Sequence, residues 1–128
     1  MERRYDIEGP EVVDKEVLEV IDFEYPGTYS TVEISTQEFT SVCPWSGLPD
    51  FGEIFIEYVP NIHLIELKSL KFYLLSFRNV GILQEHAANK ILKDLVETCD
   101  PLEMKVTGYF SLRGGLKTKV TVKYNKEK

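Results

Sequence analysis

The fold is decided by one stretch, FGEIFIEYVPNIHLIELKSLKFYLLSFRN (residues 51–79), because its hydrophobic period changes once along its length. Residues 51–59 alternate between apolar and polar side chains, which predicts a half-buried β-strand. Ile54, Ile56 and Tyr58 form its apolar face. The period then lengthens, which predicts a helix over residues 67–79. The apolar stripe of that helix is Leu67, Leu70, Leu74 and Phe77.

Similar patterns lie on both sides of this stretch. Residues 29–35 alternate, with Val32 and Ile34 facing the core, and a loop is expected over residues 36–50, where Pro and Gly exclude a helix. A second helix is expected over residues 84–99. Its buried face is Ala88, Ile91 or Leu92, Leu95 and Cys99. Residues 103–112 and 117–124 are predicted to pair as a hairpin around the turn 113–115.

Details of these elements are also predicted. Ser69 is expected to be the N-cap of the first helix, and Asn79 and Gly81 should end that helix. In the first strand of the C-terminal hairpin, one face should be buried. Its members are Met104, Val106, Phe110 and Leu112.

The order strand, strand, helix, helix, strand, strand predicts an α+β fold, in which an antiparallel four-stranded sheet carries two helices on one face. We expect a single domain over residues 1–128, with an arm of uncertain order over 1–27 that includes an extended piece or short strand. Residues 125–128 are expected to fray. The exposed edges of such a sheet must be covered or paired, which favours assembly with identical copies.

Composition excludes several classes of protein. The chain has 128 residues, a net charge of -6 and 43% hydrophobic residues, so it is globular and not a general nucleic-acid binder. Two cysteines cannot form a disulfide scaffold. The sequence has no apolar run of the ~20 residues that a membrane span needs, and its start lacks the apolar region of a signal peptide. We therefore expect a cytoplasmic protein with free thiols.

The two cysteines have different surroundings. Cys43 lies in the predicted loop near Asp50, and a loop cysteine beside a carboxylate is a candidate nucleophile. The alternative is a small buried hydrophobic residue, and this describes Cys99 better because it lies on a helix stripe. His63, His86 and the cysteines lack the spacing of a zinc site.

Charged residues mark the starts of both predicted helices. Lys68 and Lys71 stand where free backbone N–H groups favour anions, so they could hold a phosphate, although a solvated basic face is the simpler interpretation. The sequence contains no Rossmann or Walker motif. Glu85 could pair with the helix dipole, or could bind two adjacent N–H groups of a guanine-like edge.

Three stretches resemble a known family. They are Glu38-Phe-Thr-Ser-Val-Cys-Pro44 with the following Gly47 and 49–51, Glu66-Leu-Lys-Ser-Leu-Lys-Phe-Tyr73, and Ser76-Phe-Arg-Asn79 followed by Glu85 and Arg113-Gly-Gly115. They are similar to motifs of the NADPH-dependent 7-cyano-7-deazaguanine reductases, the nitrile reductases of queuosine biosynthesis. The resemblance covers residues 37–115. One difference is Gln84, which stands where His is expected in most relatives.

The resemblance implies the tunnelling fold, in which subunits pair edge to edge into a ring. At this length it implies two stacked rings with active sites between subunits. It also implies that Cys43 forms a thioimide with the nitrile, that Asp50 is the proton donor, and that two NADPH are used per turnover without a metal. The implied substrate-binding residues are Ile65, Glu66, Leu67, Gln84 and Glu85. The implied cofactor-binding residues are Lys68, Ser69 and Lys71.

Three other functions remain open from the sequence. An archaeal branch of the family transfers an amidino group to a base already in tRNA, but it lacks the motif of residues 66–71. GTP cyclohydrolase I has the same fold but requires zinc ligands that this sequence does not offer. A non-catalytic oligomeric binding module is the third, and the spacing of Cys43 and Asp50 argues against it.

Overall fold

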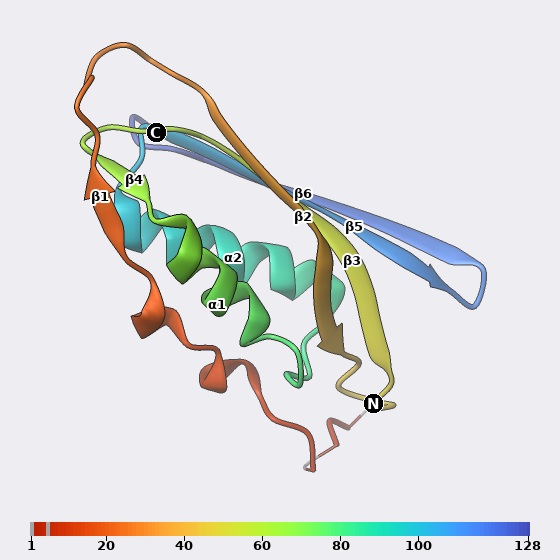
Figure 1. The fold of residues 1–128 in the computed structure, drawn as a ribbon. Coiled ribbons are helices and arrows are strands. Elements are labelled where there is room, and N and C mark those ends of the chain that lie inside the picture. The colour runs from red at the N-terminus through yellow and green to blue at the C-terminus, as the bar shows by residue number, and fades with distance from the viewer. Residues whose placement is uncertain (1, 5) are drawn as a thin grey trace.

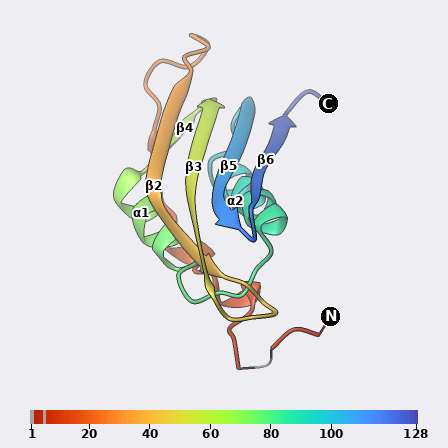
Figure 2. The ribbon, with the colours of Figure 1, turned by 90° about the vertical axis from the view of Figure 1, so that its right-hand side faces the viewer.

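The computed structural model describes residues 2–4 and 6–128 (Figure 1). Its centre is an antiparallel sheet in the order β2-β3-β5-β6. The strands are β2 (Val32–Val42), β3 (Pro49–Val59), β5 (Glu103–Arg113) and β6 (Leu116–Asn125). The helices α1 (Leu67–Leu75) and α2 (Gln84–Cys99) lie on one face of this sheet, as Figure 2 shows from the other face. The predicted α+β architecture is therefore confirmed.

The N-terminal arm runs along the outer side of α1 (Figure 1). It contains two short 3-10 helices, η1 (Pro10–Val12) and η2 (Lys15–Val17), and then β1 (Val20–Asp22). β1 pairs antiparallel with β4 (His63–Ile65) in a separate two-stranded sheet. The sequence did not indicate β4, because three residues are too few to display a period of two.

The core lies between the sheet and the helices, and it is formed by the faces that the periodicity predicted. Ile54, Ile56 and Tyr58 of β3 are at most 2% exposed, and α2 buries Ala88, Ile91, Leu95 and Cys99 completely. On α1 the stripe is only partly correct, because Leu70 and Phe77 are buried whereas Leu67 is 61% exposed. Within the described residues, no helix is long and apolar enough to cross a membrane.

The loop expected over residues 36–50 is wrong for most of its length, because residues 36–42 belong to β2 and residues 49 and 50 to β3. The strand continues to Val42, and only residues 43–48 connect it to β3. The pairing of β2 with β3 shifts between Thr36 and Phe39, which is a β-bulge. A bulge inserts one residue and reverses the alternation. Phe39 and Ser41 therefore face the core instead of continuing the pattern of Val32 and Ile34, and this broken alternation concealed the strand.

The predicted buried face of β5 is wrong at one residue, Leu112, because of a second bulge. Met104, Val106 and Phe110 are buried as expected, but Leu112 is 65% exposed. The register between β5 and β6 shifts between Phe110 and Arg113. The bulge turns Leu112 outward and brings Arg113 to the side that holds the buried residues. The turn itself is as predicted, with Gly114 and Gly115 at φ 56° and 82°.

The ends of the helices differ slightly from the prediction. The N-cap of α1 is Glu66 and not Ser69, because the Glu66 carboxylate accepts hydrogen bonds from the backbone N–H groups of Lys68 and Ser69. A carboxylate reaches these groups as well as a serine hydroxyl does, and it adds the favourable interaction with the helix dipole. α1 ends at Leu75, four residues earlier than expected, and Phe77 is buried just beyond it.

Candidate active site

The loop of residues 43–48 holds Cys43 at one end of the sheet. The Cys43 N–H donates to the carbonyl of Leu48 at 2.9 Å, and the Gly47 N–H donates to the carbonyl of Cys43 at 2.8 Å. Gly47 has φ +74°, a conformation that side chains with a Cβ rarely adopt. These bonds make a compact turn, so the position of the thiol is set by backbone geometry.

The N-terminal arm packs against this loop. The Arg4 N–H donates to the carbonyl of Pro44 at 2.9 Å, and Arg4 Nη1 donates to the carbonyl of Ser46 at 2.7 Å. Further along the arm, the carbonyl of Glu8 accepts from the Gly81 N–H at 2.7 Å. The arm that the sequence left uncertain therefore contacts the predicted nucleophile loop directly.

Asp50 stands at the start of β3 and is 5% exposed. Its cross-strand partner is Ser41, whose hydroxyl is buried and has no hydrogen-bond partner within the described residues. Asp50 Oδ1 lies 2.5 Å from Arg113 Nη1 and 3.5 Å from Gln84 Nε2. The ends of three elements, β3, β5 and α2, thus meet at this carboxylate, and the ion pair compensates for its burial.

The thiol of Cys43 is activated relative to an ordinary cysteine. Partial burial opposes its ionisation, but hydrogen bonds from the Ser46 hydroxyl and from the backbone of Ser46 and Trp45, with the charge of Arg113, lower the pKa of Cys43 overall. Burial instead raises the pKa of the Cys99 thiol to about 12. Because the thiolate is the nucleophile, these pKa shifts favour Cys43 over Cys99 as the reactive cysteine, and Cys99 belongs to the core.

The predicted site residues form two groups. The first is Cys43, Asp50, Gln84 and Glu85, and the second, residues 65–71, surrounds the start of α1. Ile65 is 4% exposed, and the Glu66 carboxylate is occupied as the helix cap. Ser69 is also buried; its hydroxyl donates to the carbonyl of Glu66 at 2.8 Å and accepts from the Glu19 N–H at 3.0 Å. Lys68 and Lys71 are exposed. Two of the backbone N–H groups expected to be free for an anion, those of Lys68 and Ser69, are therefore taken by Glu66, whereas the two ammonium groups remain exposed.

A groove of about 260 Å³ runs between α1 and the outer edge of β2. Its lining is mostly apolar, with Lys71 as its basic residue and Glu38 as its acidic residue. The lining on α1 is Leu67, Leu70, Lys71, Leu74 and Leu75, and that on β2 includes Ile34 and Phe39. The groove gives the residues at the start of α1 a concave, mostly apolar surface with one basic and one acidic side chain at it.

The two groups lie at opposite ends of the subunit. Figure 1 shows the start of α1 beside β4, while the loop of residues 43–48, between β2 and β3, lies at the other end of the sheet. α1 has nine residues, so about 13 Å of helix separates its two ends. The structure brings Asp50, Gln84 and the Cys43 loop together, with Glu85 following on α2, but it does not bring Ile65–Lys71 to them within one chain.

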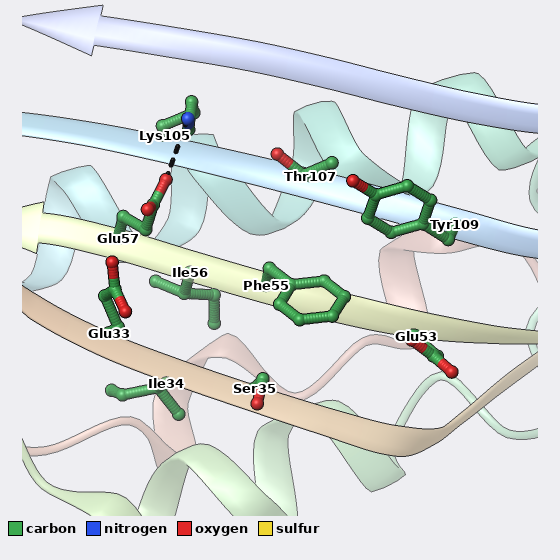
Figure 3. Close-up of a pocket in the computed structure, with 10 residues that line it drawn as sticks. All are labelled: Glu33, Ile34, Ser35, Glu53, Phe55, Ile56, Glu57, Lys105, Thr107 and Tyr109. Carbon is green, nitrogen blue, oxygen red and sulfur yellow. Dashed lines mark ion pairs between the residues drawn. The ribbon is translucent and has the colours of Figure 1, made fainter.

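A hollow of about 550 Å³ lies on the face of the sheet that carries no helix (Figure 3). Glu57 pairs with Lys105 at 2.9 Å there, and the rings of Phe55 and Tyr109 pack edge to face. The lining of this hollow includes none of the predicted catalytic or binding residues. Within the described residues, no group of three or more His, Cys, Asp or Glu is placed to hold a metal.

Two side chains of the site were not assigned a role from the sequence. Arg113 contacts Asp50, and its Nη2 lies 3.5 Å from the Ser46 hydroxyl. The Ser46 side chain also contributes to lowering the pKa of the Cys43 thiol. The available signal was the pattern Arg113-Gly-Gly115, which places a cation beside a tight turn, but the bulge that aims Arg113 inward has no local signature.

Comparison with known proteins defines the class to which this fold and site belong. Residues 49–128, which contain Asp50, both helices and Arg113, match the family described as QueF-like protein. Because this match spans more than half of the chain, the chain belongs to that family.

Curated relatives are similar over almost the whole chain. A protein of Thermoanaerobacter pseudethanolicus is 58% identical over 99% of this chain and 96% of its own length. One of Caldanaerobacter subterraneus subsp. tengcongensis is 57% identical over 98% and 94%. Both are named NADPH-dependent 7-cyano-7-deazaguanine reductase.

A solved structure supports the same fold. It is the apo form of an archaeosine synthase described as QueF-Like, with a TM-score of 0.69 and 30% sequence identity. The match covers 73% of this chain and 92% of that one. The expected resemblance to the family is confirmed, and the roles of individual residues stay predictions.

Proposed function

We propose that this protein reduces the nitrile of 7-cyano-7-deazaguanine to the aminomethyl group of 7-aminomethyl-7-deazaguanine in queuosine biosynthesis. The observation that carries the proposal is the joint presence of a reductase relative at 58% identity and an activated Cys43 in the same cluster as a buried Asp50. Neither observation alone is sufficient. The reductase activity is named for the relative and not for this chain, and a thiol beside a carboxylate occurs in many thiol enzymes.

The first step is addition of the Cys43 sulfur to the nitrile carbon. A C–S bond forms, one π bond of the nitrile breaks, and its electron pair moves to nitrogen. The proton lost by the thiol passes to Asp50 and then to that nitrogen, which gives a neutral thioimide. Asp50 suits this transfer because it is held in one position by Arg113 and is shielded from bulk water.

Two reductions complete the reaction. Conversion of a nitrile to a primary amine consumes four electrons, supplied as two hydrides by two NADPH, together with two protons. Between them the C–S bond breaks and Cys43 is released as thiol. The residues at the start of α1 fit a polyanionic cofactor, because Lys68 and Lys71 both expose ammonium groups and Lys71 also lines the groove. Gln84 and Glu85 are proposed to hold the base.

The complete site is proposed to form between two copies of the chain, as part of a ring assembly. The support is that the two groups of predicted residues lie at opposite ends of α1 in one chain. The sheet also ends in two edge strands, β2 and β6, and α1 exposes Leu67, Phe72 and Leu75. Edge pairing between copies would cover both features.

Mixed assemblies test this arrangement. At an NADPH concentration near the wild-type KM, Cys43→Ala should be inactive and the double variant Lys68→Ala/Lys71→Ala nearly so. Unfolding and refolding them together should restore activity above that of either alone. The matched control mixes Cys43→Ala with Asp50→Asn, two changes in one cluster, and this mixture should stay inactive. No recovery in the first mixture would contradict a site shared between copies.

A second candidate function follows from the solved neighbour, which is an archaeosine synthase. Such an enzyme would act on a base within tRNA and would not consume NADPH. Reduction is favoured because the reductase relatives are 51–58% identical and the archaeosine synthase is 30% identical. The residues Glu66–Lys71 also match the motif expected only in reductases.

The deciding experiment has two readouts. Loss of NADPH absorbance on adding the free nitrile base supports reduction. Intact mass after mixing protein and base without NADPH should show an adduct equal to the mass of the base, since addition expels nothing. Adduct formation only with base in tRNA, without NADPH oxidation, would contradict the proposal and favour the second candidate.

A further inference from the structure

The bulge in β5 places a cation at the centre of the candidate site. Gly52 of β3 pairs with Phe110 of β5, so the strand ends that follow bring Asp50 close to residues 112 and 113. Regular alternation would put Leu112 on the buried side and Arg113 outside. The extra residue between Phe110 and Arg113 exchanges them. Bulges are frequent beside active sites because they re-aim one side chain in this way.

Arg113 contacts both the proposed proton carrier, Asp50, and the loop that holds the proposed nucleophile, Cys43. Its Nη1 lies 2.5 Å from Asp50 Oδ1, and its Nη2 lies 3.5 Å from the hydroxyl of Ser46, which belongs to the Cys43 loop. Its side chain is 36% exposed, whereas that of Asp50 is only 4% exposed. The guanidinium therefore closes the outer side of the carboxylate and connects β3 with the loop.

We propose that Arg113 is a positioning residue, which fixes the Asp50 carboxylate at the Cys43 loop and places a positive charge beside the thiol before any substrate binds. This deepens the proposed function and rests on it for the later steps, but the resting state of the thiol can be measured without substrate. A planar guanidinium can contact Asp50 and Ser46 from two nitrogens at once, which a lysine ammonium cannot do in the same geometry.

The charged residues around the Cys43 loop support the inference that Arg113 favours the ionised thiol. Arg113 comes from β5, Asp50 from β3, and Arg4 from the N-terminal arm, where it donates to the carbonyl of Ser46. The charge of Arg113 lowers the pKa of Cys43, although burial and the hydrogen bonds of Ser46 and Trp45 contribute more. Removing this one cation should thus raise the pKa of the Cys43 thiol, but the hydrogen bonds of Ser46 and Trp45 should still lower it.

The test is the pH profile of alkylation by iodoacetamide, with Cys99→Ala as the background so that one thiol reports. Arg113→Gln should move the apparent pKa of Cys43 upward, because it removes a positive charge that favours the thiolate. Arg113→Lys should give a smaller shift. The matched control is Lys117→Gln, an exposed cation of the same hairpin, which should leave the profile unchanged.

A second measurement, the rate of adduct formation, tests whether Arg113 acts through Asp50. Arg113→Gln should slow adduct formation with the nitrile base by ~10-fold or more, and the same change should cost much less when Asp50→Asn is already present. Equal costs in both backgrounds, or an unshifted alkylation profile in a folded Arg113→Gln or Arg113→Lys variant, would overturn the proposal. A shifted profile in a protein that forms no adduct even as wild type would instead refute the proposed function and leave the role of Arg113 at the thiol intact.

Discussion

The hydroxyl of Tyr73 donates a hydrogen bond of 2.6 Å to the carboxylate of Asp94. Tyr73 on α1 is completely buried, and Asp94 on α2 is 3% exposed. The same carboxylate oxygen lies 3.1 Å from Lys90 Nζ. The bond joins the two helices at the centre of the core, so it connects the segment that carries Lys68 and Lys71 to the helix that begins at Gln84.

Tyr73→Phe should therefore lower the free energy of unfolding. The change removes one hydrogen bond to a charged group and leaves Asp94 with Lys90 as its remaining partner, which costs about 1–3 kcal/mol. Urea denaturation measures the loss, and Tyr25→Phe is the matched control because Tyr25 is 69% exposed. Equal stability of the two variants would show that the buried bond makes no net contribution.

The same tyrosine predicts a loss of stability at alkaline pH. Burial and the neighbouring Asp94 carboxylate raise the pKa of Tyr73 above its ordinary value of about 10. Above pH ~10 the unfolded chain therefore loses this proton while the folded chain keeps it, so the stabilisation is complete below that pH and declines above it. The pH profile of Tyr73→Phe should fall less steeply there. Burial also raises the pKa of Tyr58, so part of the decline should remain.

Covalent catalysis should depend on Cys43 and not on Cys99. Cys43→Ala should form no adduct with the nitrile base and oxidise no NADPH, whereas Cys99→Ala should keep most activity because its thiol is buried and un-ionised at neutral pH. Peptide mapping after brief iodoacetamide treatment should find the label on Cys43 first. NADPH oxidation by Cys43→Ala in the presence of the nitrile would disprove the thioimide route.

Proton transfer by Asp50 should be visible before any reduction occurs. Asp50→Asn removes the proton carrier while retaining nearly the same shape, so thioimide formation should slow by ~10²-fold or more. Stopped-flow absorbance or quenched intact mass gives the rate. Glu53→Gln, on the open face of the same strand, should react normally. Unchanged kinetics in Asp50→Asn would remove this residue from the mechanism.

Cofactor affinity should depend on the two exposed lysines of α1. Each charge-assisted contact contributes roughly 1.5–3 kcal/mol, so Lys68→Ala/Lys71→Ala should raise the KM for NADPH by ~10²-fold or more. Adduct formation precedes reduction and should survive in this variant. Lys93→Ala, an exposed lysine of α2, serves as the control. Loss of adduct formation with normal NADPH affinity would show that these lysines serve the base instead.

Much of the architecture follows from the sequence alone. Strict alternation at Ile54, Ile56 and Tyr58 and the helical stripe ending at Cys99 specify which faces are buried, because each depends only on the period of the local backbone. The motif around Cys43 and the segment 66–73 likewise indicated the family before any fold was known. Hydrophobic burial acts on these patterns directly, and so the sheet and both helices were predicted in the correct order.

Tertiary structure decided the features that depend on pairing between strands. A bulge is a mismatch between two strands, so nothing local to residues 36–39 or 110–113 announces it. Those two bulges turn Ser41 inward and bring Arg113 to Asp50. The cap of α1 was likewise settled by which side chain reached the free N–H groups, and Glu66 reached them rather than Ser69. The sequence determined which residues could react, and the register of the sheet determined which of them meet.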